Sequence, residues 1–182
     1  RSFTDLNTGV WYNPYTDYVI SHSLMRGLSS TLFAPNQSMT RGMMVTTLYR
    51  LAGEPQVEGT ATFQDVKSSA YYANAVAWAE ANGIAKGIDT GVFAPNAPVT
   101  REQAAAFAYR YVTAYLGKTP VPGASLGGFQ DAGLVSDYAA ESLSWAHAAG
   151  LMVGYGDGFL GPKDTVTRAQ MAKLLTLLAQ NF

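Results

Sequence analysis

Three arginines in equivalent sequence settings are the strongest candidates for binding chemistry in this chain. Each directly follows a threonine, in the pairs Thr40-Arg41, Thr100-Arg101 and Thr167-Arg168. A guanidinium offers a planar fork of donors to a carboxylate, and a helix N-terminus would add backbone donors to the same anion site. Because the helix dipole disfavours a cation in the first turn, this placement indicates a specific partner. That partner is either an acidic ligand or one of three recurring aspartates, Asp5, Asp65 and Asp131.

A second position also carries charge, directly before a glycine that recurs in each unit. The residues at this position are Arg26, Lys86 and Val153, and the glycines are Gly27, Gly87 and Gly154. If the position helps to hold an acidic sugar, the three sites cannot be equivalent, because one lacks the cation. The alternative is an ordinary solvated surface side chain.

Aromatic residues supply two candidate rings per unit. One set is Trp11, Tyr71 and Tyr138, and the other is Tyr18, Trp78 and Trp145. An exposed ring beside an arginine can stack on the apolar face of a sugar. Aromatic residues at helical spacing are also typical of a packed core, and the sequence does not choose between the two sets.

Several other chemistries find no support. The absence of cysteine excludes disulfides, iron–sulfur clusters and thiolate zinc sites. His22 and His147 have no second ligand at a metal spacing, so no metal or other cofactor is expected. The glycines of residues 154–158 lack the strand and helix context of a nucleotide loop. Pairs of acids suit glycoside hydrolysis, but an aspartate at a fixed place in every unit favours a scaffold role, and no catalytic residue is assigned.

These positions belong to a threefold repeat of about sixty residues. In each copy a proline lies six residues before the arginine, and the recurring glycine lies fourteen before it. A Phe-x-Asp motif opens each copy, with 22, 22 and 23 residues from the aspartate to the glycine. Segments rich in glycine and proline separate the copies. The predicted units are residues 1–57, 58–123 and 124–182.

Within each unit the pattern predicts helix, loop, helix. The second helix begins at the threonine, which caps its N-terminus. Gln103 and Gln170 complete a capping box worth about 1 kcal/mol, whereas unit one has Met43 at this place. Apolar residues follow at helical spacing, and no segment alternates like a strand. The chain is predicted to be all-α.

The first helix of each unit is marked mainly by its ends. In unit two it is expected over residues 71–82, followed by Gly83 in a left-handed conformation. Gly150 has this place in unit three, but unit one has Ser23. Asn13 is expected as the N-cap of the first helix of unit one, with Pro14 in its first position.

Composition limits the function further. The 182 residues are 48% hydrophobic, which suffices for a packed core, and carry a net charge of −1, which argues against nucleic-acid binding. No apolar run reaches the ~18–20 residues of a membrane span. No signal peptide is evident, and the start at Arg1 is expected to reflect a longer parent chain.

The threefold pattern resembles the S-layer homology domain family over nearly the whole chain. The motifs that carry the resemblance are residues 82–87, 100–103, 154–158 and 167–170. The resemblance implies a pseudo-threefold spindle in which one helix per repeat forms a central three-helix bundle. It also implies that grooves between repeats bind secondary cell-wall polysaccharide through a pyruvylated N-acetylmannosamine unit.

The leading hypothesis is therefore a non-catalytic anchoring module that tethers a larger secreted protein to a Gram-positive-type cell wall. Its partner would be an acidic wall glycan. An assembly module that self-associates in a surface lattice is the second hypothesis, and a small wall-acting glycoside hydrolase is the third.

Unit two alone keeps the full set of motif residues. Because unit one lacks the capping glutamine and unit three has Val153, at most two grooves are expected to bind well. Each groove is expected to draw on two neighbouring units, with the best one built around unit two. Arg101→Ala is accordingly expected to weaken binding more than Arg41→Ala.

Overall fold

Six α-helices form the regular framework of this protein, as seen in a computed structural model that describes residues 2–182. Two pairs of neighbouring elements are continuous: a π-helical turn, Tyr111–Tyr115, extends α4, and a short turn, Asp137–Ala139, leads into α5. The helices are α1 (Asn13–Ser21), α2 (Arg41–Leu51), α3 (Ala73–Ala81), α4 (Arg101–Arg110), α5 (Ala140–Ala148) and α6 (Arg168–Asn181). Residues 2–182 contain isolated β-bridges but no sheet, so the predicted all-α class is confirmed.

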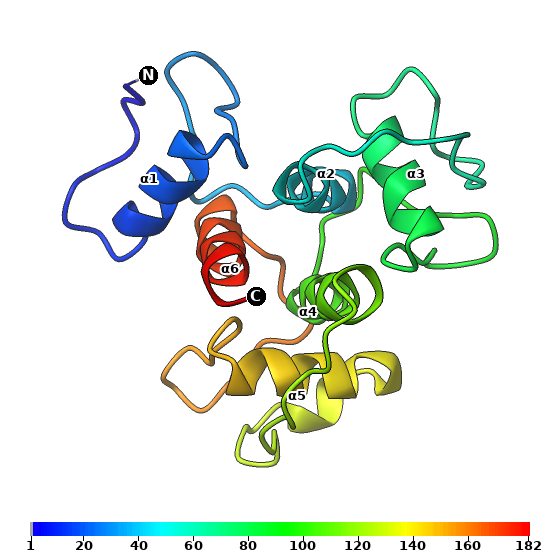
Figure 1. The fold of residues 1–182 in the computed structure, drawn as a ribbon. Coiled ribbons are helices and arrows are strands. Elements are labelled where there is room, and N and C mark those ends of the chain that lie inside the picture. Colours follow the sequence, from blue (N-terminus) through cyan, green and yellow to red (C-terminus); the bar gives the residue numbers. More distant parts are fainter. Residues whose placement is uncertain (1) are drawn as a thin grey trace.

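The helices pack between units rather than within them. Figure 1 shows α2, α4 and α6 in the centre, with α1, α3 and α5 around them. Helix α1 packs on α6, α3 on α2, and α5 on α4. Each outer helix therefore covers the central helix of another unit, and the first unit closes against the last.

A ring of main-chain hydrogen bonds joins the three units just before the central helices begin. The N–H of Val99 donates to the carbonyl of Met39 at 2.9 Å, and the N–H of Met39 donates to that of Val166 at 2.8 Å. The N–H of Val166 closes the ring on the carbonyl of Val99 at 3.0 Å. All three residues are buried, so these bonds are protected from water.

The predicted N-termini of the central helices are confirmed. The hydroxyls of Thr40, Thr100 and Thr167 each accept from the backbone N–H three residues later. The capping box is complete in α4 and α6 and incomplete in α2, as the glutamine pattern predicted.

The outer helices depart slightly from prediction. Helix α1 begins at Asn13, so Tyr12 rather than Asn13 is its N-cap. Pro14 still lies in the first turn, where its missing N–H costs nothing. Helix α3 spans Ala73–Ala81, shorter than expected, because Tyr72 forms its N-cap and Asn82 its C-cap.

Ser23 has a left-handed backbone at the position where the other two units have glycine. Its φ is +58°, and the equivalent Gly83 and Gly150 both have a φ of +72°. Serine is strained there because its Cβ crowds the following carbonyl, whereas glycine has no Cβ.

Replacing Ser23 by glycine should therefore raise the free energy of unfolding by about 1 kcal/mol. Gly150→Ser is the matched reverse exchange, since a Cβ at Gly150 would meet no atom within 4 Å and only backbone strain would act. Urea denaturation should show opposite changes for the two variants. A destabilised Ser23→Gly variant would contradict the strain argument.

Candidate ligand-binding grooves

One loop residue in each unit is held from both sides by the recurring aspartate and arginine. The carboxylate of Asp65 accepts from the N–H groups of Phe93 and Ala94 at 2.9 and 2.7 Å. Nε of Arg41 donates to the carbonyl of the same Phe93 at 2.8 Å, and its Nη2 donates to the carbonyl of Lys86 at 3.2 Å. The equivalent contacts join Asp5 and Arg168 to Phe33, and Asp131 and Arg101 to Leu160.

We call this arrangement the Asp–loop–Arg clamp, and it answers the question of the arginine's partner. The arginine side chains bind backbone carbonyls of another unit, and they form no ion pair with the aspartates within residues 2–182. The alternative of a salt bridge to the aspartate is therefore wrong, because the aspartate's hydrogen-bonding capacity is directed at the loop. Arg41 is only 3% exposed, and its guanidinium also lies over the rings of Phe93 and Phe107.

The expected contribution of helix N-termini to an anion site is also wrong. The N–H groups of Arg41 and Gly42 donate to the carbonyls of Ala97 and Pro95 in the next unit, at 2.9 and 2.8 Å. The same pattern occurs at α4 and α6. Since the capping threonine takes the next N–H, the first-turn donors already have protein partners.

The clamp changes the acidity of its carboxyl groups. Burial alone would raise the pKa of Asp65, but hydrogen bonds from Phe93 and Ala94 outweigh it and hold the pKa below the ordinary 3.8. Asp5 has the same balance with Phe33 and Ala34. For Asp131 the hydrogen bond from Leu160 is the largest cause of its lowered pKa.

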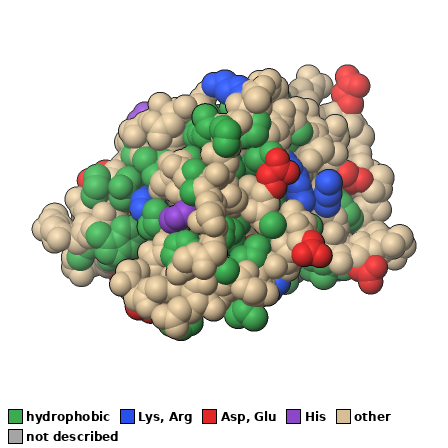
Figure 2. Space-filling view, turned by 90° about the horizontal axis from the view of Figure 1, so that it is seen from below, with side chains coloured by type: hydrophobic (Ala, Val, Ile, Leu, Met, Phe, Trp, Pro, Cys, Tyr) green, Lys and Arg blue, Asp and Glu red, His purple; other side chains and the backbone are tan. Residues whose placement is uncertain are grey.

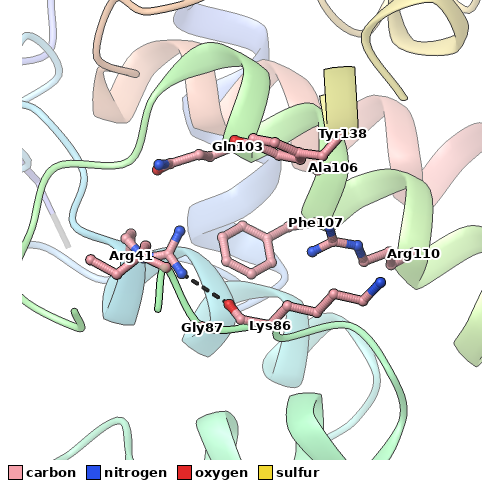
Figure 3. A pocket seen from close by; sticks show the side chains of 9 residues that line it. Arg41, Lys86, Gly87, Gln103, Ala106, Phe107, Arg110 and Tyr138 are labelled. Carbon is pink, nitrogen blue, oxygen red and sulfur yellow. Dashed lines mark hydrogen bonds between the residues drawn. The ribbon is translucent and has the colours of Figure 1, made fainter. Parts of the chain in front are cut away.

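Beside each clamp lies a groove, and the first is the Arg41 groove. Its volume is about 410 Å³. Figure 3 shows Arg41 and Arg110 on either side of Phe107, with Lys86 alongside and Tyr138 across the opening. Three cations from units one and two thus surround a space whose rim comes from unit three. No carboxylate lines it among the residues described.

The other two grooves follow the same plan with different residues. The Arg168 groove, of about 400 Å³, is lined by the cations Arg168, Arg26 and Arg50 and by Tyr71. The Arg101 groove has about 200 Å³ and is lined by Trp11, Val153 and Lys173. The ring of Tyr155 lies 4.7 Å from the Arg101 guanidinium carbon, in a position that is Leu28 or Ile88 elsewhere.

The structure separates the two aromatic sets. Trp11, Tyr71 and Tyr138 are 57, 65 and 54% exposed, and each lines one groove. Trp78 and Trp145 are 3 and 1% exposed and pack in the core, so their rings are not accessible to a ligand. Tyr18 stacks on His22 instead, with 3.9 Å between ring centroids, and lines none of the three grooves.

The remaining predicted site residues divide between binding surface and scaffold. Gln103 and Gln170 line grooves while completing their capping boxes, and the aspartates support the loops from outside the grooves. The recurring glycines lie in the groove walls because nothing larger fits. A Cβ on Gly27, Gly87 or Gly154 would meet the ring of the Phe-x-Asp phenylalanine at 2.3, 3.1 or 2.6 Å.

The expectation that Arg101 shares one groove with Lys86 and Gln103 is wrong. Lys86 and Gln103 lie in the Arg41 groove, whereas Arg101 lies in the Arg101 groove with Val153. Each arginine reaches into the following unit, so unit two divides its motif residues between two grooves. Each groove also draws on three units rather than two.

Sequence reasoning missed three of the groove cations, Arg50, Arg110 and Lys173, and one buried acid. Arg50 and Arg110 recur ten residues after the capping threonine in units one and two, and this repetition could have revealed them. Glu102 is 2% exposed and bonds to Ser136 and Lys163 of unit three. Nothing in the spacing indicates that contact, because Glu102 has glycine and alanine as its counterparts.

Comparison with known proteins identifies the repeat. The S-layer homology domain matches three segments, residues 2–43, 62–105 and 128–172. The chain belongs to the S-layer homology domain family. Each matched segment falls within one predicted unit, and family membership indicates a cell-wall anchoring module.

S-layer homology domains similar to this one occur in much longer proteins. An endoglucanase of Bacillus sp. (strain KSM-635) is 33% identical over 97% of this chain and 18% of its own length. An amylopullulanase of Thermoanaerobacterium thermosulfurigenes is 30% identical, over 96% of this chain and 9% of its own. The surface-layer 125 kDa protein of Lysinibacillus sphaericus is 30% identical, over 90% and 14%. The chain thus spans less than a fifth of these relatives.

Residues 2–182 contain neither a helix suited to span a membrane nor a cluster of metal-binding side chains. No helix in the described part of the chain combines the length and apolar character needed to cross a bilayer. Within residues 2–182, acidic and histidine side chains nowhere gather in a group of three that could hold a metal ion.

The clamp predicts a specific loss of stability in acid. Because the folded-state pKa of Asp65 lies below 3.8, its contribution is present above that pH and is lost as the pH falls through the folded value. Asp65→Asn should therefore cost about 1 kcal/mol at pH 7, a low value because the group is exposed, and less at pH 3. Glu58→Gln, at an exposed position, is the control. Urea denaturation between pH 7 and pH 3 should show that Asp65→Asn loses less unfolding free energy in acid. A difference between the variant and the unchanged protein that grows in acid would contradict the clamp.

Proposed function

We propose that this chain anchors its parent protein to the cell wall by binding an acidic wall polysaccharide in the Arg41 and Arg168 grooves. The observation that carries the proposal is that three cations and no carboxylate line each of these grooves. An anionic group would gain charge-assisted hydrogen bonds there from side chains that the fold has already placed. The chain itself carries out no reaction in this proposal.

The charge distribution supports local recognition of an acidic group. The net charge of the chain is −1, and Figure 2 shows charged side chains sparsely distributed among hydrophobic and uncharged ones on one face. A polyanion would therefore meet no general positive field, and its attraction would come from the grooves. Screening by salt would then reduce the affinity only moderately.

An aromatic ring on each rim supports a sugar as the ligand. Tyr138 and Tyr71 are more than half exposed although they lie beside arginine-lined grooves. A pyranose has an apolar face that can pack on such a ring while its acidic substituent reaches the cations. The pyruvylated N-acetylmannosamine unit implied by family resemblance has both features.

The Arg101 groove is proposed to contribute least. Its volume is half that of the others, and Val153 replaces the cation that Lys86 and Arg26 supply elsewhere. Tyr155 covers the Arg101 guanidinium, and its hydroxyl is bonded to Asp164 at 2.7 Å. Burial first, and then this hydrogen bond, raise the pKa of Tyr155 to about 12, so the ring stays neutral.

Assembly into a surface lattice is the second candidate function. Val121 and Leu134 are 61 and 60% exposed outside the grooves, and such apolar side chains can contribute to protein interfaces. Sedimentation at high concentration distinguishes the two: a monomer that binds wall material supports anchoring, and self-association without wall binding supports assembly.

Binding to purified wall sacculi tests the anchoring proposal directly. The protein should co-sediment with intact sacculi and remain in solution once acid has stripped the secondary polymer. Equal binding before and after stripping would refute it.

Removal of the acidic group should abolish measurable binding. The probe is the methyl glycoside of pyruvylated N-acetylmannosamine, compared by calorimetry with the same glycoside lacking pyruvate. Each charge-assisted hydrogen bond that is lost costs roughly 1.5–3 kcal/mol, or about ten- to a hundredfold in affinity, so losing the bonds from several cations takes binding below detection. Equal affinity for the neutral sugar would show that the cations are not the binding groups.

Lys86→Met should weaken binding in the Arg41 groove by about tenfold and lower the apparent stoichiometry. The side chain is exposed, so the variant should keep its fold. Lys67→Met makes the same chemical change in the same unit at an exposed position outside the grooves, and should bind as the unchanged protein does. If both variants lose affinity equally, the effect is one of net charge and the groove assignment is wrong.

A further inference from the structure

A buried carboxylate ties the rim of the Arg41 groove to the central helix beneath it. Glu102 lies in the first turn of α4, and its Oε2 accepts from the N–H of Ser136 at 2.9 Å. Its Oε1 accepts from the Ser136 hydroxyl at 2.7 Å and from Nζ of Lys163 at 2.5 Å. Lys163 also donates to the Ser136 hydroxyl. Both oxygens of a side chain in unit two are thus used to hold unit three.

The segment held in this way carries the groove's aromatic ring. Ser136 directly precedes the short turn Asp137–Ala139, and the N–H of Ala139 donates to the carbonyl of Ser136 at 3.0 Å. Tyr138 lies inside that turn, 54% exposed, and none of the hydrogen bonds found in residues 2–182 involves its hydroxyl. The position of the ring therefore depends on the backbone of this turn, which Ser136 holds at its start and the buried Ala139 at its end.

The other two grooves do not have this tether. The residues equivalent to Glu102 are Gly42 and Ala169, neither of which has a polar side chain. Gly42 lies against the ring of Tyr72, where a Cβ would come within 3.0 Å. In unit three the counterpart of Tyr72 is Ala139, so the space that an aromatic ring fills beside α2 is free for a carboxylate beside α4.

We infer that Glu102 is a positioning residue that fixes Tyr138 across the Arg41 groove, through Ser136 and Lys163, and so preorganises this groove for an acidic sugar. The part of the inference that concerns sugar rests on the proposed function. The part that concerns the ring does not. A rim that is already fixed loses less conformational freedom on binding, which is a recognised source of affinity.

The first experiment measures the ring without any sugar. 3-Fluorotyrosine is placed at position 138, and the ¹⁹F line width is compared between the unchanged protein, Glu102→Ala and Glu102→Gln. The line should narrow in the alanine variant because the ring becomes mobile, and the glutamine variant should restore part of the width. Thermal unfolding followed by circular dichroism confirms that each variant is folded.

Glu141→Ala is the matched control for this measurement. Its carboxylate also joins α5 to α4, by accepting from the Tyr109 hydroxyl at 2.9 Å, but none of the hydrogen bonds found in residues 2–182 joins it to Ser136. This variant should leave the fluorine line unchanged. A line that is unchanged in Glu102→Ala, or that narrows equally in Glu141→Ala, would overturn the inference.

The second experiment is a double-mutant cycle with Tyr138→Leu, using the methyl glycoside of pyruvylated N-acetylmannosamine. Glu102→Ala should weaken binding about fivefold when Tyr138 is present, which is the loss expected for one aromatic contact. It should change the affinity less than twofold in the Tyr138→Leu background. A residue that merely stabilised the fold would cost the same in both backgrounds, and that result would overturn the positioning role. If the unchanged protein does not bind the glycoside, the proposed function falls, while the fluorine measurement still decides the positioning role.

Discussion

The backbone of one loop residue per unit is the point on which this fold depends. In unit two that residue is Phe93, whose N–H is bound by Asp65 from its own unit and whose carbonyl is bound by Arg41 from another. A cation at a helix N-terminus opposes the helix dipole, and its hydrogen bonds to carbonyl oxygens compensate for that placement. The acid shapes the loop, and the base joins it to the neighbouring unit. Together with the main-chain bonds from Arg41 and Gly42 to Ala97 and Pro95, these contacts fix the loop against the central helix.

The grooves follow from the way in which the Asp–loop–Arg clamp connects neighbouring units. Because Arg41 crosses from one unit to the next, the space beside it is bounded by a loop and a helix of unit two and by the rim of unit three. The arginine that closes the interface has three further nitrogen-bound protons whose direction is set by the clamp. The burial that fixes the guanidinium therefore also determines how it faces the groove.

Local features of the fold could be read from the sequence, and features that join distant residues could not. The threonine caps, the glutamine capping boxes and the left-handed Gly83 depend on residues within a few positions of one another, and all three are present. The arginines' true partners are backbone carbonyls of another unit, which leave no trace in side-chain types. The choice between the two aromatic sets depended on burial. Trp78 has a ring of the type that stacks on sugars, but it is buried in the core.

The ring of hydrogen bonds through Met39, Val99 and Val166 has no first or last member. Helix α1 from the start of the chain covers α6 from its end, so the contact that closes the ring is of the same kind as the two that the chain connects covalently. The cyclic order of the units is thus set by their interfaces, and the linkers only determine where the ring is opened. A circularly permuted chain that began with unit two and ended with unit one could form the same three interfaces between units. The three units therefore close on one another, and none of them is an end of the assembly.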